Sequence, residues 1–291
     1  MSVYRTPDER FAQLPDWPYE PRYVEQSDLR MHYVDEGGGD PMLLLHGEPT
    51  WAFLYRKMIP RLSALRRIVA PDYFGFGRSD KPTDAGWYTY DAHYRSIEEL
   101  CDRLELTRLT IVVQDWGGPI GLRYAVEHEE RVERLVILNT GVGGGRAPSE
   151  EWLRFREMMR NVGTGIVPSR LVQSGCVGEL PQDVLGAYDA PFPTAESRTG
   201  VAEFPEQVPV EPEHPNTPKM NAVLERLHGW EKPALVLFSD SDRIFSLRHA
   251  QRLAEWIPGA ELSEPIVGAG HFLQEERGEE IAERVAAWLG A

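Results

Sequence analysis

The chain has 291 residues, of which 42% are hydrophobic and 26% are charged, and its formal net charge is −15. This length allows one α/β domain with an insertion, or two small domains, around a sizeable core. The acidic balance argues against nucleic acid as a partner, because phosphates require basic patches, and against an anionic membrane surface.

Three further features bear on the compartment. The segment Met1–Pro21 is polar and charged and lacks the apolar core of a signal peptide. No apolar run approaches the roughly 18 residues needed to span a bilayer. Cys101 and Cys176 lie far apart, and we expect free thiols rather than a disulfide. We therefore expect a cytoplasmic protein without membrane contact.

Short apolar runs alternate with longer amphipathic segments along the chain, which is typical of a mostly parallel sheet flanked by helices. Helical periodicity is clearest in the segments 94–104 and 281–289. The first predicted strand is expected to be antiparallel to the others. The predicted strands are Arg30–Val34, Met42–Leu45, Arg67–Ala70, Leu109–Val113, Leu135–Leu138 and Ala234–Phe238.

About 100 residues separate the last two predicted strands, which is too many for a single crossover. The interval begins with Gly141–Gly145, which predicts a hinge, and ends in a proline-rich stretch, which predicts a stiff, extended return path. Between them, Trp152–Asn161 is predicted as one helix and Arg170–Tyr188 as one or two. We therefore expect a helical cap at residues 141–220, inserted into a core formed by residues 1–140 and 221–291.

The strand Leu109–Val113 leads through Gln114 directly into Asp115, which is followed by small residues that open a helix. This pattern places a carboxylate at the tip of a strand-to-helix turn, where α/β-hydrolases hold their nucleophile, usually a serine. An aspartate there can attack carbon and form an ester that water must then hydrolyse. Taken alone, an aspartate that caps the helix explains the residue about as well.

The same layout requires an acid and then a histidine, each after a later strand. Asp242 follows the strand Ala234–Phe238, and His271 lies in a glycine-rich loop before the last helix. Asp242 would orient the ring and stabilise the imidazolium, while Asp240 is the competing acid and is more typical of a turn. His271 alone could be a loop residue, but the order Asp115, Asp242, His271 favours a catalytic triad.

The loop that starts at His46 follows the strand Met42–Leu45. A loop in this position supplies one backbone N–H of an oxyanion hole, and the residue after the nucleophile supplies the other. These donors are predicted to be Glu48 and Trp116. For the side chain of His46 we expect a structural role.

Three motifs together, His-Gly-Glu-Pro-Thr-Trp, Val-Gln-Asp-Trp-Gly-Gly and Gly-His-Phe, resemble those of the haloalkane dehalogenases, specifically their first subfamily. The similarity runs from Arg5 to the C-terminal helix and is weakest at Gly141–Arg146 and Glu206–Asn221. It implies an α/β-hydrolase fold with an inserted helical cap. It also implies a small halogenated alkane as substrate, with water as co-substrate and neither a cofactor nor a metal.

The resemblance assigns a role to each candidate: Asp115 as nucleophile, His271 as the base that activates water, and Asp242 as the acid. It also implies two tryptophans that bind halide, Trp116 and one from the cap. The cap interval offers Trp152 and, close to its exit, Trp230, and Trp152 is the better candidate because it begins a helix and has Phe155 three residues on. Two indole N–H groups can hold an anion without adding a cation that would pair with the nucleophile. An aromatic residue that only packs the cap onto the core is the alternative.

The pocket itself is less well defined by the sequence. Phe204, Val208, Ile244 and Phe245 are candidate walls, with plain core packing as an equal alternative. Pro119 stands where some relatives have an aromatic residue, so one wall is expected to be more open. Because the base must be neutral, activity should fall at acid pH. We expect a monomer, with a weak homo-oligomer as the alternative.

Two rival functions stay open at this point. An epoxide hydrolase would use the same triad, but it must protonate the leaving oxygen, typically with cap tyrosines, and the cap has one clear tyrosine, Tyr188. A ligand-binding homologue without catalysis would be expected to have lost a member of the triad, and none is missing. A defluorinating relative usually carries arginine after the nucleophile, where this chain has Trp116.

Overall fold

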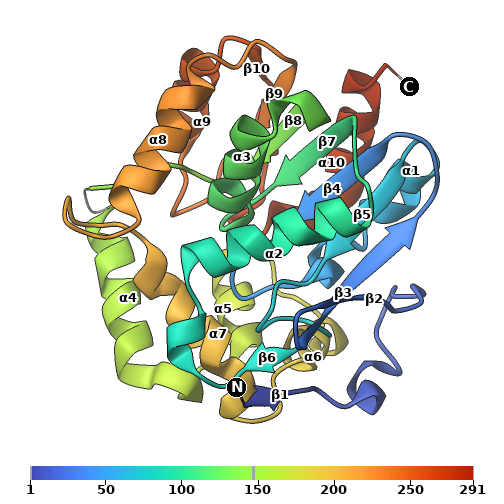
Figure 1. Cartoon of the computed structure of the whole chain (residues 1–291), viewed down its shortest axis with the longest axis vertical. Helices are drawn as coiled ribbons and strands as arrows, with labels where there is room; N and C mark the ends of the chain where they lie inside the picture. The colour runs from blue at the N-terminus through green and yellow to red at the C-terminus, as the bar shows by residue number, and fades with distance from the viewer. Residues whose placement is uncertain (1, 146–147, 291) are drawn as a thin grey trace.

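The computed structural model describes residues 2–145 and 148–290. Its centre is an eight-stranded sheet with the strand order β10-β9-β8-β7-β4-β5-β3-β2 (Figure 1). A second, two-stranded sheet pairs β1 (Val3–Tyr4) with β6 (Lys81–Pro82). The strands of the large sheet are β2 (Arg22–Gln26), β3 (Leu29–Glu36), β4 (Pro41–Leu45), β5 (Arg67–Pro71), β7 (Leu109–Val113), β8 (Val132–Leu138), β9 (Ala234–Leu237) and β10 (Ala260–Leu262).

All strands from β4 onward pair in parallel in the large sheet, whereas β3 runs antiparallel to both β2 and β5. The sequence-based prediction of a mostly parallel sheet with an antiparallel strand near its start is therefore confirmed. That antiparallel strand, predicted at Arg30–Val34, lies within β3. The short strands β2 and β10 were not predicted, because neither carries a continuous apolar run.

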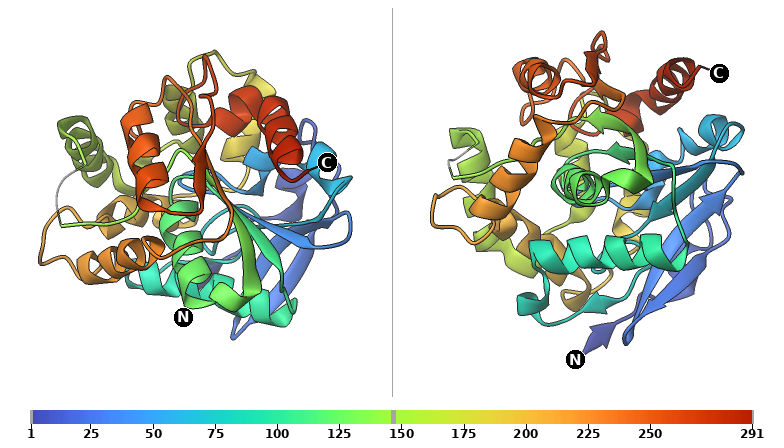
Figure 2. Two further views of the ribbon diagram at one scale, coloured as in Figure 1. Left: turned by 90° about the horizontal axis from the view of Figure 1, so that it is seen from above. Right: turned by 45° about the horizontal axis from the view of Figure 1, so that its top comes forward.

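Helices cover both faces of the large sheet (Figures 1 and 2). On β4, Leu43 and Leu45 pack into the core beneath α2, α3, α8 and α9, while Met42 and Leu44 pack into the core beneath α1 and α10. A parallel sheet buried on both faces explains why the predicted strands are runs of apolar residues without alternation. The α-helices are α1 (Ile59–Ser63), α2 (Tyr90–Arg103), α3 (Gly117–Glu127), α4 (Glu150–Val162), α5 (Pro168–Gly175), α6 (Gln182–Asp189), α7 (Thr199–Glu203), α8 (Thr217–Leu227), α9 (Leu247–Trp256) and α10 (Leu273–Trp288).

Between β8 and β9, the helices α4 to α7 gather beside the ends of β4 and β7 (Figure 1). The predicted helix at Trp152–Asn161 lies within α4, and the segment Arg170–Tyr188 forms the two helices α5 and α6. The division into core and cap stays a prediction. Its second boundary, at residue 220, falls inside α8, which packs against α3.

The proline-rich return path is not a continuous extended segment, which corrects the prediction. Pro205 lies in the 3-10 helix η7 (Phe204–Gln207), and Pro218 lies in the first turn of α8. Proline suits the first turn of a helix, because the N–H that it lacks has no partner there. The prolines therefore mark helix starts here.

The two cysteines are free thiols, as predicted. Cys101 is buried in α2, and Cys176 is half-buried directly after α5. Within residues 2–145 and 148–290, no helix combines the length and the apolar character needed to cross a membrane.

A buried ion pair joins the core to the segment between β8 and β9. The Nη2 atom of Arg56 lies 2.7 Å from Oε1 of Glu275, and both side chains are almost fully buried. The hydroxyl of Tyr188, at the end of α6, donates to Oε2 of the same carboxylate at 2.6 Å. Because a buried charge is costly unless it is paired, the contacts among Arg56, Glu275 and Tyr188 tie α6 firmly to the core.

Two glycines let α3 start close to the sheet. A Cβ atom on Gly117 would overlap the carbonyl oxygen of Leu45 at the end of β4, and a Cβ on Gly118 would overlap Oγ1 of Thr140 after β8. This close approach fixes the position of the turn between β7 and α3.

We predict that Gly117→Ala destabilises the protein by about 1–3 kcal/mol, because backbone rather than a flexible side chain blocks the new methyl group. Gly186→Ala in α6 is the matched control, since nothing lies within 4 Å of its added Cβ. Alanine should stabilise α6 there by about 0.5–1 kcal/mol. Urea unfolding of both variants checks this, and equal stabilities would contradict it.

Candidate active site

The turn between β7 and α3 holds Asp115 in a left-handed backbone conformation, with φ of 49°. Three backbone hydrogen bonds fix it. Its N–H donates to the carbonyl of Asn139 at 3.0 Å, and its carbonyl accepts from Gly118 N at 2.9 Å and from Oγ1 of Thr140 at 2.6 Å. The predicted elbow is therefore present, and its strained conformation is held from two neighbouring segments.

The loop after β4 contacts the carboxylate of Asp115 directly. The backbone N–H of Glu48 donates to Oδ1 of Asp115 at 2.8 Å, and the peptide bond between Glu48 and Pro49 is cis. This close contact requires a glycine at position 47, because a Cβ atom there would overlap the Asp115 side chain. The N–H of Glu48 thus lies where an oxyanion donor is expected. The second donor, the N–H of Trp116, stays a prediction.

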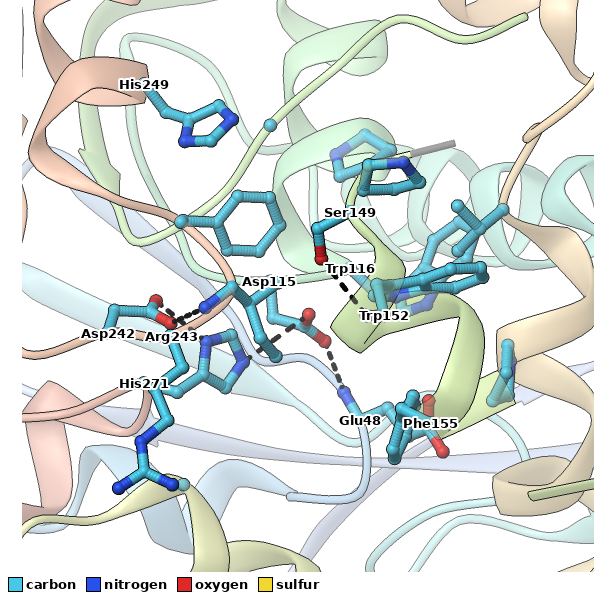
Figure 3. A pocket seen from close by; sticks show the side chains of 18 of the residues that line it. Glu48, Asp115, Trp116, Ser149, Trp152, Phe155, Asp242, Arg243, His249 and His271 are labelled. Atoms are coloured by element: carbon cyan, nitrogen blue, oxygen red, sulfur yellow. Dashed lines mark hydrogen bonds and ion pairs between the residues drawn. The ribbon is translucent and has the colours of Figure 1, made fainter. Parts of the chain in front are cut away.

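His271 lies between two carboxylates (Figure 3). Its Nδ1 is 3.0 Å from Oδ2 of Asp242, and its Nε2 is 3.5 Å from Oδ2 of Asp115. The other oxygen of Asp242 accepts from the backbone N–H of Ile244 at 2.7 Å, which orients the carboxylate. Asp240, the competing acid, is exposed and accepts from Gly268 N at 2.9 Å. The structure therefore brings together the three predicted residues and leaves Asp240 in a turn.

Electrostatics favour the protonated ring in this arrangement. Burial lowers the pKa of His271, but the charge of Asp242 and the hydrogen bonds to Asp115 and Asp242 outweigh it and raise this pKa to about 10. Burial alone would raise the pKa of Asp242, but the imidazolium and its hydrogen bond lower it. This shift favours the imidazolium form of His271 at neutral pH. The neutral base expected from the sequence is therefore not the form favoured in the resting site.

The two predicted halide-binding tryptophans line one cavity with Asp115. Trp116 packs its ring on Phe204 at a centroid distance of 5.0 Å, and Trp152 starts α4, with its backbone N–H capped by Ser149 at 3.0 Å. Neither indole N–H donates a hydrogen bond to any residue in the ranges 2–145 and 148–290. Both donors are therefore available to a ligand, and Figure 3 shows them on the same side of Asp115.

The cavity has a volume of about 1200 Å³. Val208, Ile244 and Phe245 line it, as predicted, and so does Pro119. Phe204 was also predicted to be a wall, but it lies behind Trp116, with its ring stacked on His93 at a centroid distance of 4.5 Å. Because Trp116 lies between Phe204 and the cavity, the ring of Phe204 supports the wall but does not form it.

The side chain of Glu48 was missed by the sequence analysis, which assigned a role only to its backbone. It lines the cavity, and its Oε1 is buried without a hydrogen-bond partner among the described residues. Burial, and then the charge of Asp115, raise the pKa of Glu48 well above its ordinary range. The carboxyl group of Glu48 is therefore favoured as a neutral acid.

Two other supporting residues were missed: Gln114 stands in the elbow motif but was given no role, and no motif marks Asn139. The Nε2 atom of Gln114 donates to the carbonyl of His271 at 3.1 Å, and the amide of Asn139 donates to Oγ of Ser239 at 2.7 Å. Gln114 and Asn139 each come directly after the last residue of a central strand, and this position in the sequence could have identified them as candidates. His46 has the structural role expected, because its ring accepts from Tyr73 N at 3.2 Å.

Tyr188, the one clear tyrosine of the predicted cap, is fully buried, and its hydroxyl is engaged by Glu275. No tyrosine lines the cavity within the described part of the chain. In the same ranges, no group of three or more His, Cys, Asp and Glu residues is placed to hold a metal ion.

The sheet order, the elbow and the Asp–His–Asp arrangement define an α/β-hydrolase, and the family model described as "alpha/beta hydrolase fold" matches residues 40–168. The chain is 44% identical to haloalkane dehalogenase 1 of Mycobacterium tuberculosis over the full length of both proteins. It is 41% identical to a haloalkane dehalogenase of Psychrobacter cryohalolentis, over 99% of this chain and 98% of the other. The protein therefore belongs to the haloalkane dehalogenase family.

Solved structures agree with this assignment. The haloalkane dehalogenase DpaA from Paraglaciecola agarilytica, whose structure is described as tetrameric, superimposes with a TM-score of 0.92 at 34% identity. The match covers 98% of this chain and 97% of that one.

The charge state of Glu48 can be tested through stability. A carboxyl group whose pKa is raised by folding contributes stability that is full below its unfolded pKa, about 4.3, and is lost as pH rises through the folded pKa. Glutamine cannot ionise, so Glu48→Gln lacks this loss of stability. The Tm of the variant minus the Tm of the wild type should therefore increase from pH 5 to pH 8. Scanning calorimetry measures both, and a constant difference would mean that Glu48 is ionised in the folded protein.

Proposed function

We propose that this enzyme hydrolyses haloalkanes to an alcohol, a halide ion and a proton through an alkyl ester on Asp115. One observation carries the proposal: a carboxylate and two unpaired indole N–H groups share one cavity. The carboxylate can displace a leaving group from carbon, and the indoles of Trp116 and Trp152 can receive that leaving group as an anion. Water is the only co-substrate that this chemistry needs.

In the first step, Oδ2 of Asp115 attacks the carbon that bears the halogen, and the carbon–halogen bond breaks. The electron pair of that bond leaves with the halide, so negative charge moves from the carboxylate to the leaving atom. Donors placed where this charge develops lower the barrier, and this is the role of Trp116 and Trp152. The apolar walls exclude water that would solvate the carboxylate.

The second step depends on a change in the pKa of His271. Once Asp115 is an ester, its charge and its hydrogen bond to Nε2 are gone, and both had raised that pKa. The ring then loses its proton to solvent and becomes a base. It takes a proton from a water molecule, which attacks the carbonyl carbon of the ester, with the N–H of Glu48 facing the new oxyanion. The acyl C–O bond breaks, the alcohol leaves and the carboxylate is restored.

Two rival functions have less support. An epoxide hydrolase needs an acid for the leaving oxygen, and the hydroxyl of Tyr188 is committed to Glu275. A binding protein without catalysis gives no reason for Asp115, Asp242 and His271 to lie within contact distance.

The direct test is to incubate the enzyme with 1-bromobutane and, separately, with styrene oxide. We expect bromide and butanol from the first and no diol from the second, because the site offers two indole donors to an anion but no tyrosine hydroxyl among its described lining residues to protonate an alkoxide. Ion chromatography and chiral gas chromatography measure the products. Diol without bromide would favour the epoxide function.

The division of labour predicts what His271→Gln does. Alkylation needs only Asp115 and the tryptophans, so 1,2-dibromoethane should form an ester that is no longer hydrolysed. Intact-protein mass spectrometry should show the added alkyl mass, and Asp115→Asn is the control that should show none. For the same reason, the ester should also accumulate in the wild-type enzyme at acid pH. An unmodified His271→Gln protein would refute the assignment.

The cellular compartment and the oligomeric state are also proposals. We propose a cytoplasmic monomer, and size-exclusion chromatography with light scattering measures the mass. The tetrameric DpaA shows that at least one family member assembles further.

A further inference from the structure

The cavity is larger than its inner end requires. Its volume of about 1200 Å³ exceeds the roughly 300–1,000 Å³ of most ligand pockets, although a short haloalkane needs only a small part of that space. Asp115 and His271 form the inner end. The lining also includes residues of α8 and α9, and we call the part of the cavity that these two helices line the outer arm.

A row of rings connects the inner end to the outer arm. The ring of Phe245 lies nearly parallel to that of His271, at a centroid distance of 5.9 Å, and its centroid is 6.1 Å from that of His249 on α9. Figure 3 shows His249 on the opposite side of the cavity from Glu48. The outer arm therefore starts where an apolar ring separates it from the catalytic residues.

Beyond His249, α9 presents Arg252 and Trp256 to the same cavity. These residues are three and seven positions on, so they lie on one face of the helix and extend roughly 10 Å along it. On the facing wall, α8 contributes Asn221 and Leu224. A chain bound at Asp115 would thus reach Arg252 only after an apolar passage.

Two polar side chains of the outer arm, Arg252 and Asn221, offer hydrogen-bond donors. Arg252 is half-buried and forms no ion pair or hydrogen bond with any residue in the described ranges. The side-chain oxygen of Asn221 already accepts from Gly144 N at 2.8 Å, which leaves its amide N–H groups. The acid at the rim, Glu151, lies 3.7 Å from Arg154. Arg252 is thus an unpaired cation of the outer arm, while Arg243, the other arginine that lines the cavity, is next to Asp242 in the sequence.

The net charge of −15 gives the protein an overall field that repels anions, so an anion is held only where a local cation faces it. A half-buried arginine without a carboxylate partner is a suitable site for an anion that arrives with the substrate, because guanidinium binds carboxylates in two parallel hydrogen bonds. The apolar passage suits a methylene chain between the two charged ends.

We propose that the outer arm binds a carboxylate at the far end of the substrate, so that the preferred substrate class is the medium-chain ω-haloalkanoates. The halogen-bearing carbon then lies at Asp115, the methylene chain passes Phe245 and Leu224, and the carboxylate pairs with Arg252. This inference rests on the proposed function and specifies its substrate.

The test compares 8-bromooctanoate with 8-bromo-1-octanol, which has the same length but no charge. Arg252→Gln should raise KM for the carboxylate about tenfold, the loss expected for one charge-assisted hydrogen-bonded pair, with kcat nearly unchanged. The alcohol should be turned over as in the wild type. Arg248→Gln is the matched control. This substitution removes the same charge from α9, but Arg248 is exposed and does not line the cavity.

Binding of octanoate itself gives a readout that needs no catalysis. Calorimetric titration should show about tenfold weaker binding to Arg252→Gln than to the wild type or to Arg248→Gln, and the difference should shrink at high salt. Equal losses in both variants would mean general charge steering and would overturn the inference. Bromide release from the alcohol without any specific effect of Arg252→Gln would overturn it while leaving the proposed function intact. No bromide from either compound, nor from 1-bromobutane, would instead count against the proposed function.

Discussion

The geometry of the whole site depends on one left-handed residue at the junction of β7 and α3. A residue with a side chain in this conformation is strained by about 1–3 kcal/mol, and the strain persists only when the surroundings enforce it. Here the surroundings are the carbonyl of Asn139, the side-chain hydroxyl of Thr140 and the close approach of α3 to β4. With Asp115 turned outward in this way, its carboxylate meets the loop after β4 on one side and His271 on the other.

The second constraint is charge. Four ionisable groups share the inner end of the cavity, and their protonation states differ because their surroundings differ. Asp242 is held ionised by the imidazolium, and Glu48 is held neutral by burial beside Asp115. His271 responds to the charge of Asp115. In the proposed cycle, the step that makes the ester is therefore also the step that prepares the base, and no separate conformational change is required.

Much of this arrangement could be predicted from the sequence. Strand runs such as Leu109–Val113 are buried on both faces and stand out by composition, and the residues at their ends follow from the fold. What could not be predicted depends on three-dimensional packing. Phe204 is apolar and lies in the right region, yet only the packing decides that it supports Trp116 instead of lining the cavity. The burial of the Glu48 carboxyl group could likewise not be predicted from the sequence, because a glutamate in a loop is normally solvated.

The attachment of the segment between β8 and β9 is uneven, and this has a kinetic consequence. One side, α6, is tied to the core through Tyr188 and the buried pair of Arg56 with Glu275. The other side, α4, buries only Trp152 and Met159, and its ion pair between Arg160 and Glu206 faces solvent. Local opening concentrates where buried contacts are few. The side that carries Trp152 therefore has fewer buried ties to the core than the side that carries Tyr188, so local opening on this side would uncover a halide before it disturbed the Asp115 end of the cavity.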